Sequence, residues 1–235
     1  MGKNDRVRIA PSLICTDICN LETSVRSLES IGMELLHVDL LDGYFSPSMP
    51  IGLDVVRQLR KKTALDFDVH LMVRENEFFI NEFIGMGVQR LCFHYETALH
   101  ADRLLGMLKA NNIKAGIAIN PATPLSALDY VVERCDFILL MLINPGYAGH
   151  KSEEQVPYAV KKVADCHKYL LGKNPDTEIE IDGRVSFENI PDLVASGAGT
   201  LVAGSKSLFH GEDTLANNLE KMKKAISAGI KGAYS

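Results

Sequence analysis

The sequence predicts a single (β/α)₈ (TIM) barrel domain that spans residues 1–235. Three observations support this fold class. Short apolar segments alternate with amphipathic stretches along the whole chain, eight of each kind. The apolar segments are too short and too uniformly apolar for exposed hairpins, which indicates parallel strands covered by helices. The length of 235 residues suits one barrel, which takes roughly 250 residues, and no Gly/Ser-rich linker divides the chain.

The expected strands and helices follow one another in order along the chain. Each strand is predicted from a short apolar run, and each helix from apolar residues that recur every three or four positions. The strands span Val7–Leu13, Leu35–Leu40, Leu65–Met72, Arg90–His94, Lys114–Ile119, Phe137–Ile143, Glu178–Ile181 and Thr200–Ala203. The helices span Leu21–Ser30, Leu53–Lys61, Phe78–Met86, Ala101–Ala110, Ser126–Glu133, Val156–Leu170, Phe187–Val194 and Thr214–Ala228.

Composition and charge exclude several classes of function. The formal net charge of -5, from 25 basic and 30 acidic residues, argues against a nucleic-acid partner, and no basic run is present. The longest clearly apolar run, Phe137–Ile143, is far shorter than the ~20 residues that span a bilayer, so no membrane partner is expected. The polar segment Met1–Arg8 does not resemble the apolar core of a signal peptide. The five cysteines form no CxxC pair, which favours reduced thiols in a cytoplasmic protein.

Polar side chains interrupt the apolar pattern where the predicted strands end. In a parallel barrel the carboxyl ends of the strands share one face, where active sites are assembled. His37 and Asp39 are two residues apart on one strand, so their side chains project to the same face. His70 ends the next strand, and Asp182 ends the seventh. Two imidazoles and two carboxylates suit Zn²⁺, Mn²⁺ or Fe²⁺, but from spacing alone a hydrogen-bonded cluster without metal fits equally well.

Three glycine-containing loops follow the last three predicted strands. They are Asn144–Gly149, Asp182–Arg184 and Ala203–Ser205, the last with Ser205 expected near a helix start. Glycine lets backbone N–H groups approach an anion, and the loops after strands seven and eight commonly hold phosphate in this fold. One such loop indicates no more than a turn. Three loops on neighbouring strands predict an anion site at the same end of the barrel as the polar cluster.

Six segments, in order from about Ile9 to Phe209, resemble the ribulose-phosphate 3-epimerase family. They are Ala10-Pro-Ser-Leu13, His37-Val-Asp-Leu-Leu-Asp-Gly43, Asp68-Val-His-Leu-Met72, Asn144-Pro-Gly-Tyr-Ala-Gly149, Asp182-Gly183 and Ala203-Gly-Ser205. The resemblance implies an isomerase that epimerises a phosphorylated ketose with the help of one divalent metal ion, which is zinc, iron or manganese. We also expect a homo-oligomer.

The resemblance implies roles for particular residues. The metal ligands would be His37, Asp39, His70 and Asp182, and the two aspartates would also be the catalytic acid/base groups. Ser12 would form a hydrogen bond near the reacting end of the substrate. The remaining substrate-binding residues would be His70, Met72 and Met141 in the pocket, and Gly146, Tyr147, Ala148, Gly149, Asp182, Gly183, Arg184, Gly204 and Ser205 in the loops.

The implied reaction explains why two carboxylates and a metal ion are needed. Removing a proton next to a ketone leaves an enediolate, whose negative charge a metal ion can stabilise. Inverting the carbon requires that the proton leave from one face and return to the other. Two carboxylates on opposite sides of the substrate meet that requirement.

Several residues depart from the family pattern and leave the identity of the ketose open. Leu41 stands where the family usually has methionine. The phosphate loops differ from the usual pattern at Ala148, His150 and Arg184. The segments Tyr147-Ala-Gly149 and Gly204-Ser-Lys-Ser-Leu-Phe209 look closer to allulose-6-phosphate 3-epimerases. The expected substrate is therefore of the ribulose 5-phosphate type, with allulose 6-phosphate or another ketose phosphate as the alternative.

Two other functions would fit a phosphate-binding barrel. Decarboxylases and aldol-type synthases of related barrels carry an Asp-x-Lys arrangement, whereas the second and third strands here read His37-Val-Asp39 and Asp68-Val-His70. A non-catalytic sugar-phosphate sensor is expected to lose one acid/base carboxylate, and both Asp39 and Asp182 are present. Both functions are therefore disfavoured.

Overall fold

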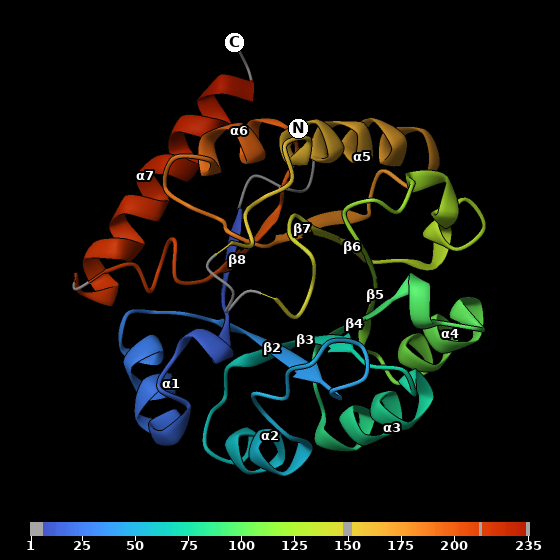
Figure 1. Cartoon of the computed structure of the whole chain (residues 1–235), viewed down its shortest axis with the longest axis horizontal. Helices are drawn as coiled ribbons and strands as arrows, with labels where there is room; N and C mark the ends of the chain where they lie inside the picture. The colour runs from blue at the N-terminus through green and yellow to red at the C-terminus, as the bar shows by residue number, and fades with distance from the viewer. Residues whose placement is uncertain (1–6, 148–151, 212, 234–235) are drawn as a thin grey trace.

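Eight parallel strands form a barrel at the centre of the computed structural model, which describes residues 7–147, 152–211 and 213–233 (Figure 1). The strands are β1 (Arg8–Pro11), β2 (Leu35–Leu41), β3 (Asp66–Met72), β4 (Arg90–His94), β5 (Lys114–Ile119), β6 (Phe137–Met141), β7 (Glu178–Asp182) and β8 (Thr200–Ala203). Their hydrogen-bonded order is β1-β8-β7-β6-β5-β4-β3-β2, and every pair in it is parallel. The predicted barrel is therefore confirmed.

The barrel closes between its first two strands. One parallel bridge, from Ser12 to His37, joins β1 to β2. In the register of β2 and β3, Asp39 lies beside His70. Asp182 ends β7 on the other side of the closure. Because all strands run in the same direction, their carboxyl ends form one mouth, and these polar strand ends belong to it.

Seven α-helices in the described ranges surround the strands, as the outer ring of coils in Figure 1 shows. They are α1 (Leu21–Ser30), α2 (Leu53–Arg60), α3 (Asn76–Met86), α4 (Ala101–Ala110), α5 (Ala159–Lys173), α6 (Ile190–Ala195) and α7 (Leu215–Ala233). Short 3₁₀ helices η1 (Leu13–Cys15), η2 (Ile18–Asn20) and η3 (Tyr95–Thr97) lie after β1 and β4. Seven of the predicted helices are confirmed, α1 and α4 with the predicted bounds and the other five with shifted ends. None of the described helices has the length and apolar character needed to cross a bilayer.

The prediction of an α-helix over Ser126–Glu133 is wrong. Two 3₁₀ helices, η4 (Leu125–Leu128) and η5 (Val132–Arg134), occupy this stretch instead. The apolar residues here recur every third position, which suits the three-residue turn of a 3₁₀ helix as well as it suits an α-helix. Leu128 and Val131 are both buried, so the short turns still cover the barrel between β5 and β6.

The sixth strand ends two residues earlier than predicted. The chain bends after Met141, yet Leu142 and Ile143 remain buried. The amide of Leu142 donates to the carbonyl of Asp182 at 2.7 Å, which keeps the bend against β7. The whole apolar run is therefore buried, but its last two residues already belong to the loop at the mouth.

The interior of the barrel differs from the shell around it. The shell between strands and helices is apolar and holds large buried side chains such as Phe67 and Phe83. Inside the barrel, one part is lined by the apolar cluster of Cys92, Ala118, Phe137, Leu139, Met141, Ile143 and Val202. The other part holds the buried charged or titratable side chains His37, Asp39, Asp68, His70, Arg90, His94 and Glu180. Because buried charges are costly unless they are paired, this polar part of the interior points to function.

Candidate active site at the barrel mouth

The four residues predicted as metal ligands converge at the mouth. One ligand atom each from His37, Asp39, His70 and Asp182 lies within 4.8 Å of the others. His37 Nε2 lies 3.3 Å from Asp39 Oδ1, and His70 Nδ1 lies 3.2 Å from the same oxygen. His70 Nδ1 also lies 3.9 Å from Asp182 Oδ2. Three strands thus bring two nitrogens and two carboxylates to one centre.

This centre has the properties of a divalent-metal site. The Nε2 atom of His37 is buried, and apart from its 3.3 Å approach to Asp39 Oδ1 it has no hydrogen-bond partner among the described residues. A buried polar atom without a partner is costly, and a cation at the centre would satisfy it. Two imidazole nitrogens and two carboxylate oxygens also match the donors that Zn²⁺, Mn²⁺ and Fe²⁺ accept. The residues therefore fit one such ion.

Access to the centre comes from the side of Asp182. The side chains of His37 and His70 are fully buried and that of Asp39 is 5% exposed, whereas that of Asp182 is 20% exposed. A small molecule that enters the mouth would therefore meet Asp182 before it meets the other three residues.

The two carboxyl groups at the centre differ in proton affinity. Burial, and then the negative charge of Asp39, raise the pKa of Asp182 to about 7. Burial also acts to raise the pKa of Asp39, but His37 and His70 outweigh it and hold that pKa well below its usual range. Burial lowers the pKa of His37, yet Asp39 and the carboxylates beneath outweigh it and raise that pKa well above its usual value. Two neighbouring carboxyls with separated pKa values are a common arrangement for a base and an acid.

Ser12 and the two predicted pocket methionines also lie at the carboxyl ends of strands, at the mouth of the barrel. The hydroxyl of Ser12 donates to Asp39 Oδ2 at 2.9 Å, which fixes the second oxygen of that carboxylate. Met72 and Met141 are buried at the ends of β3 and β6. Met141 lies beside Asp182 in the strand register and belongs to the apolar cluster inside the barrel. Substrate contact by these two side chains stays a prediction.

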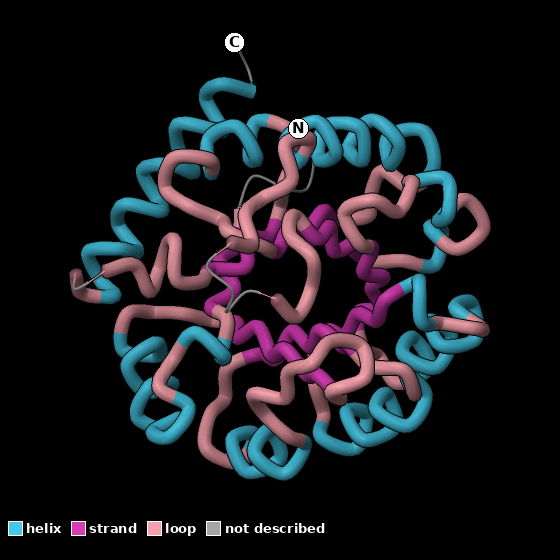
Figure 2. The backbone as a smooth tube through the Cα atoms, in the orientation of Figure 1, coloured by secondary structure: helices cyan, strands magenta, loops and turns pink. Residues whose placement is uncertain are grey.

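The loop after β6 reaches across the mouth to the loop after β2 (Figure 2). Gly146 in this loop has a φ of +84°, and a Cβ there would overlap the side chain of Ser46. Glycine is therefore required on two grounds, the left-handed backbone and the close approach. Tyr147 follows it. The predicted phosphate-loop residues Ala148 and Gly149, with His150, lie outside the described residues.

The turn after β7 is tied to the segment that follows this loop. Gly183 and Arg184 have φ values of +117° and +52°. A Cβ on Gly183 would lie 2.9 Å from the backbone nitrogen of Ile143, so glycine lets the two loops touch. The Nε of Arg184 donates to the carbonyl of Glu153 at 2.8 Å. Arg184 is thus near the β6 loop, and its contact with a phosphate stays a prediction.

The loop after β8 is a compact turn. The amides of Ser207 and Phe209 each donate to the carbonyl of Gly204 at 3.1 Å. Ser205 is exposed within this turn. The expectation that a helix starts near Ser205 is wrong, because the described residues turn here and α7 begins only at Leu215. Phosphate binding at this loop would therefore depend on turn amides and not on a helix terminus.

A second polar layer surrounds the site, and sequence reasoning missed the part of it that lies beneath the site. His70 Nε2 lies 2.9 Å from His94 Nε2, and His94 Nδ1 lies 3.2 Å from Glu96 Oε2. Beneath the site, His37 Nδ1 contacts Asp68 and Glu180. The available signal was the period of two along each strand, because Asp68 precedes His70 and Glu180 precedes Asp182 by two positions.

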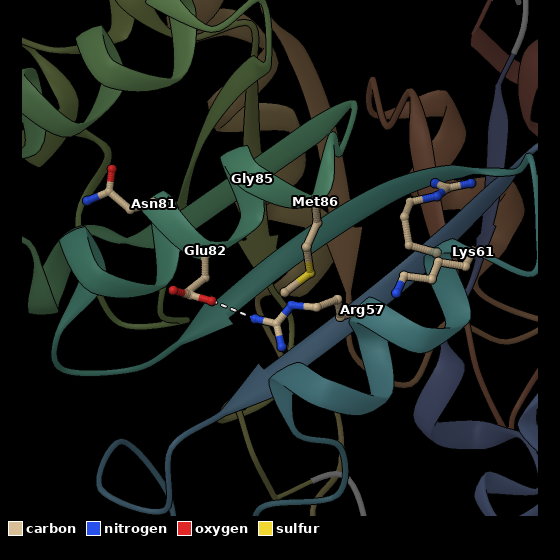
Figure 3. A pocket seen from close by; sticks show the side chains of 7 residues that line it. Arg57, Lys61, Asn81, Glu82, Gly85 and Met86 are labelled. Atoms are coloured by element: carbon tan, nitrogen blue, oxygen red, sulfur yellow. Dashed lines mark hydrogen bonds and ion pairs between the residues drawn. The ribbon is translucent and has the colours of Figure 1, made fainter.

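A separate hollow lies on the outside of the barrel between α2 and α3. Figure 3 shows it lined by Arg57, Lys61, Asn81, Glu82, Gly85 and Met86, together with Arg60. Its volume is about 410 Å³. Arg57 is engaged by an ion pair to Glu82 at 2.6 Å. Helices of a barrel run opposite to its strands, so the carboxyl ends of α2 and α3 lie away from the mouth. The hollow is not part of the candidate active site.

Fold and site together define a (β/α)₈-barrel enzyme whose mouth carries two histidines and two aspartates in metal-ligand proximity. The chain belongs to the ribulose-phosphate 3-epimerase family, because the sequence pattern described as "Ribulose-phosphate 3 epimerase family" matches residues 8–209. This membership identifies the chain as an isomerase, an epimerase that acts on carbohydrates.

Individual relatives agree with the family assignment. The chain is 34% identical over 219 residues to ribulose-phosphate 3-epimerase of Buchnera aphidicola, covering 93% of this chain and 94% of the relative. It is 37% identical over 214 residues to the chloroplastic ribulose-5-phosphate-3-epimerase of Arabidopsis thaliana, with 90% and 74% covered. It is 36% identical over 198 residues to ribulose-phosphate 3-epimerase of Escherichia coli K12, with 84% and 87% covered.

Solved structures with little sequence identity share the fold. 3-Hexulose-6-phosphate synthase of Salmonella typhimurium superimposes with a TM-score of 0.69 at 10% identity, covering 94% of this chain and 99% of that chain. Orotidine 5'-monophosphate decarboxylase of Sulfolobus solfataricus gives 0.65 at 14% identity, with 96% and 100% covered. At these identities the likeness concerns the barrel alone.

Proposed function

We propose that the chain interconverts the C3 epimers of a phosphorylated ketose, ribulose 5-phosphate and xylulose 5-phosphate, with one divalent metal ion held by His37, Asp39, His70 and Asp182. The observation that carries the proposal is the convergence of two carboxyls and two imidazoles at one centre. Family membership supports the reaction type and favours a pentose phosphate as substrate.

In this mechanism the two carboxyls act on opposite faces of the reacting carbon. Asp39 is ionised at neutral pH and accepts the proton next to the ketone on its own face. Asp182, as the second acid/base group, delivers a proton from the other face and so inverts the centre. In the reverse reaction the two residues exchange roles. A divalent ion, with zinc, iron and manganese as the candidates, would supply positive charge where the substrate's enediolate becomes negative.

The remaining residues bind and orient the substrate. The hydroxyl of Ser12 holds one oxygen of Asp39, which leaves the other directed at the centre. Met72 and Met141 form the apolar wall of the pocket. The phosphate binds at the loops after β6, β7 and β8, through Gly146, Tyr147, Ala148, Gly149, Gly183, Arg184, Gly204 and Ser205. The homo-oligomer and the cytoplasmic location expected from the sequence belong to the same proposal.

The test is turnover by purified protein after a chelator has removed metal and after zinc, iron or manganese has been restored singly. Ribulose 5-phosphate and allulose 6-phosphate are supplied in parallel, and the product isomer is read by NMR. We expect metal-dependent formation of xylulose 5-phosphate, with the higher kcat/KM for the pentose phosphate. A metal-replete protein that turns over neither sugar, nor any other ketose phosphate, would instead be a sugar-phosphate sensor.

A further inference from the structure

A buried arginine lies beneath the candidate metal site, inside the barrel. Arg90 of β4 is only 2% exposed and is surrounded by three carboxylates. Its Nε contacts Asp68 Oδ1 at 3.0 Å, its Nη2 contacts Glu180 Oε2 at 2.6 Å, and its Nη1 contacts Glu178 Oε2 at 3.4 Å. These carboxylates come from β3 and β7, the strands that also carry His70 and Asp182. Arg90 therefore joins the two sides of the barrel interior beneath the site.

Two of these carboxylates connect Arg90 to a predicted metal ligand. Asp68 uses Oδ1 for Arg90 and Oδ2 for His37 Nδ1, the latter at 3.1 Å. Glu180 uses Oε2 for Arg90 and Oε1 for His37 Nδ1, the latter at 3.3 Å. Each carboxylate thus has one oxygen on the guanidinium and the other toward the imidazole. A hydrogen on Nδ1 faces these two acceptors, so that Nε2 of His37 is presented to the site.

The guanidinium is also held in place from its flat side. Its central carbon lies 4.2 Å from the ring centroid of Phe137 on β6. The ring can occupy this position because Gly116 of β5 lies next to it, where a Cβ would overlap the ring atoms. A planar group with several fixed donors suits this position, because it can stack on a ring and hold two carboxylates at once.

The same geometry supplies positive charge to a second group of possible metal ligands beneath the site. Ligand atoms of His37, Asp68 and Glu180 lie within 4.8 Å of one another and could in principle hold an ion. The second oxygen of each carboxylate is already bound by Arg90, which supplies the compensating positive charge. The arginine occupies the role that a second cation would otherwise have.

We infer that Arg90 is a positioning residue for the metal site. It fixes Asp68 and Glu180 so that they hold His37 with Nε2 directed at the mouth. This inference rests on the proposed function, since it requires that His37 bind a metal ion. A purely structural salt bridge would affect folding stability only. The positioning role of Arg90 also predicts an effect on metal affinity and on the geometry of the bound ion.

The experiment measures Co²⁺ binding to metal-free protein, using the visible absorption of the bound ion as a report on its coordination. Wild type is compared with Arg90→Met and Arg90→Lys. The matched control is Arg60→Met, because Arg60 also stacks on a phenylalanine, Phe67 at 4.1 Å, and donates to backbone carbonyls, but outside the barrel. Thermal unfolding of each metal-free variant gives the effect on stability separately.

We expect Arg90→Met to weaken Co²⁺ binding by about tenfold or more and to change the absorption spectrum, as is usual when a group that orients a metal ligand is lost. Arg60→Met should lower the unfolding temperature but leave Co²⁺ affinity and spectrum as in wild type. Arg90→Lys keeps the charge but not the planar fork, so it should fold and still bind Co²⁺ more weakly than wild type. If Arg90→Met does not fold, Arg90→Lys is the variant that tests whether Arg90 affects metal binding.

The outcomes separate this inference from the proposed function. A wild-type protein that binds no Co²⁺ at the mouth would overturn the proposed metal site, and with it this role. If wild type binds Co²⁺ and a folded Arg90 variant binds it with the same affinity and spectrum, the proposed function stands and Arg90 is a structural residue only.

Discussion

The Nε2 atoms of His70 and His94 face each other at 2.9 Å inside the barrel mouth. Only one of the two nitrogens can carry the hydrogen of this contact. His70 Nδ1 faces the two aspartates, so a metal ion bound there leaves the hydrogen of His70 on Nε2. His94 then accepts at Nε2 and donates from Nδ1 to Glu96, whose Oε2 is 3.2 Å away. The tautomers that let His70 bind a metal ion through Nδ1 therefore also let His94 donate to an ionised Glu96.

The first prediction concerns Glu96, whose pKa is lowered to about 2 although burial opposes this, because His94, Thr123 and the amide of Asn120 stabilise its charge. Glu96→Gln removes the negative acceptor that orients His94. We expect metal affinity to fall about tenfold or more, since the orientation of His70 depends on this contact. Equilibrium competition with a chelator measures the affinity.

The control for Glu96 separates its contact with His94 from its contact with Thr123. The hydroxyl of Thr123 also donates to Glu96, so Thr123→Val removes this contact and leaves the contacts with His94 and with the amide of Asn120. This variant should keep wild-type metal affinity. Equal losses in Glu96→Gln and Thr123→Val would mean that the loop, and not His94, accounts for the effect.

The second prediction concerns the pH dependence of metal binding. The pKa of Asp182 is raised to about 7 and that of His37 is raised above its usual value, so both groups hold protons in the metal-free protein below pH 7. A metal ion must displace these protons. Affinity should therefore fall by between ten- and a hundredfold per pH unit below about pH 7. Calorimetry in two buffers of different ionisation enthalpy counts the protons released. An affinity that stays constant from pH 6 to pH 8 would contradict this prediction.

The barrel was predictable from sequence because its signal is local and repeated. Each strand is a short buried run, and most helices show an apolar face, so eight repeats outweigh errors in single elements. The error at Ser126–Glu133 arose because apolar residues spaced by three fit both a 3₁₀ and an α-helix. The end of β6 was missed because Leu142 and Ile143 stay buried after the strand has ended.

The site was predictable to the extent that it follows from strand ends. The convergence of His37, Asp39, His70 and Asp182 follows from parallel strands of known direction. The contact of Arg90 with Asp68 and Glu180 could not be predicted in the same way, because it depends on side-chain reach across the barrel interior. Sequence spacing fixes which face a side chain leaves from, but not which strand across the barrel it meets.

The third prediction concerns Arg184 and the phosphate. Arg184→Ala should raise KM for a phosphorylated ketose about five- to tenfold and change kcat little, because the lost charge acts on binding in ground and transition states alike. Alanine is the suitable replacement because arginine and alanine are similarly strained at a φ of +52°. Steady-state kinetics give both constants. The unphosphorylated ketose serves as the control, because its weak binding should not change. An unaltered KM for the phosphorylated sugar would refute the role of Arg184.

The fourth prediction concerns stability of the loop after β5. Lys162 of α5 is buried and donates to the carbonyls of Asn120, Pro121 and Thr123 at 2.7, 2.6 and 3.0 Å. Lys162→Met leaves three carbonyls without this donor and should lower the free energy of unfolding by about 2 kcal/mol. Denaturant titration measures the change. The neighbouring variant Lys161→Met is the control, because Lys161 is 74% exposed and should change stability little. Equal stabilities of the two variants would show that the buried contacts contribute nothing.

The last prediction tests the two-carboxylate mechanism through Asp182. Asp182→Asn removes the proton donor on one face of the reacting carbon, so epimerisation should fall by at least about a hundredfold, the lower range for one acid/base group. Asp39 stays ionised and can still remove a proton and return it on its own face. In deuterated water the variant should therefore wash solvent deuterium into one epimer while forming little of the other. NMR of the reacting carbon measures the deuterium content and the isomer ratio in the same sample.

Metal content is the control for this variant, because Asp182 is a proposed metal ligand and its replacement could empty the site. An asparagine oxygen can still serve as a ligand, so each sample is first loaded with metal and its content measured. Samples with one ion per chain are then compared with wild type. If loaded Asp182→Asn protein exchanges deuterium into one epimer only, the two residues act on separate faces. If it interconverts both epimers at close to the wild-type rate, Asp182 is not the second acid/base group, and the proton that inverts the carbon comes from elsewhere.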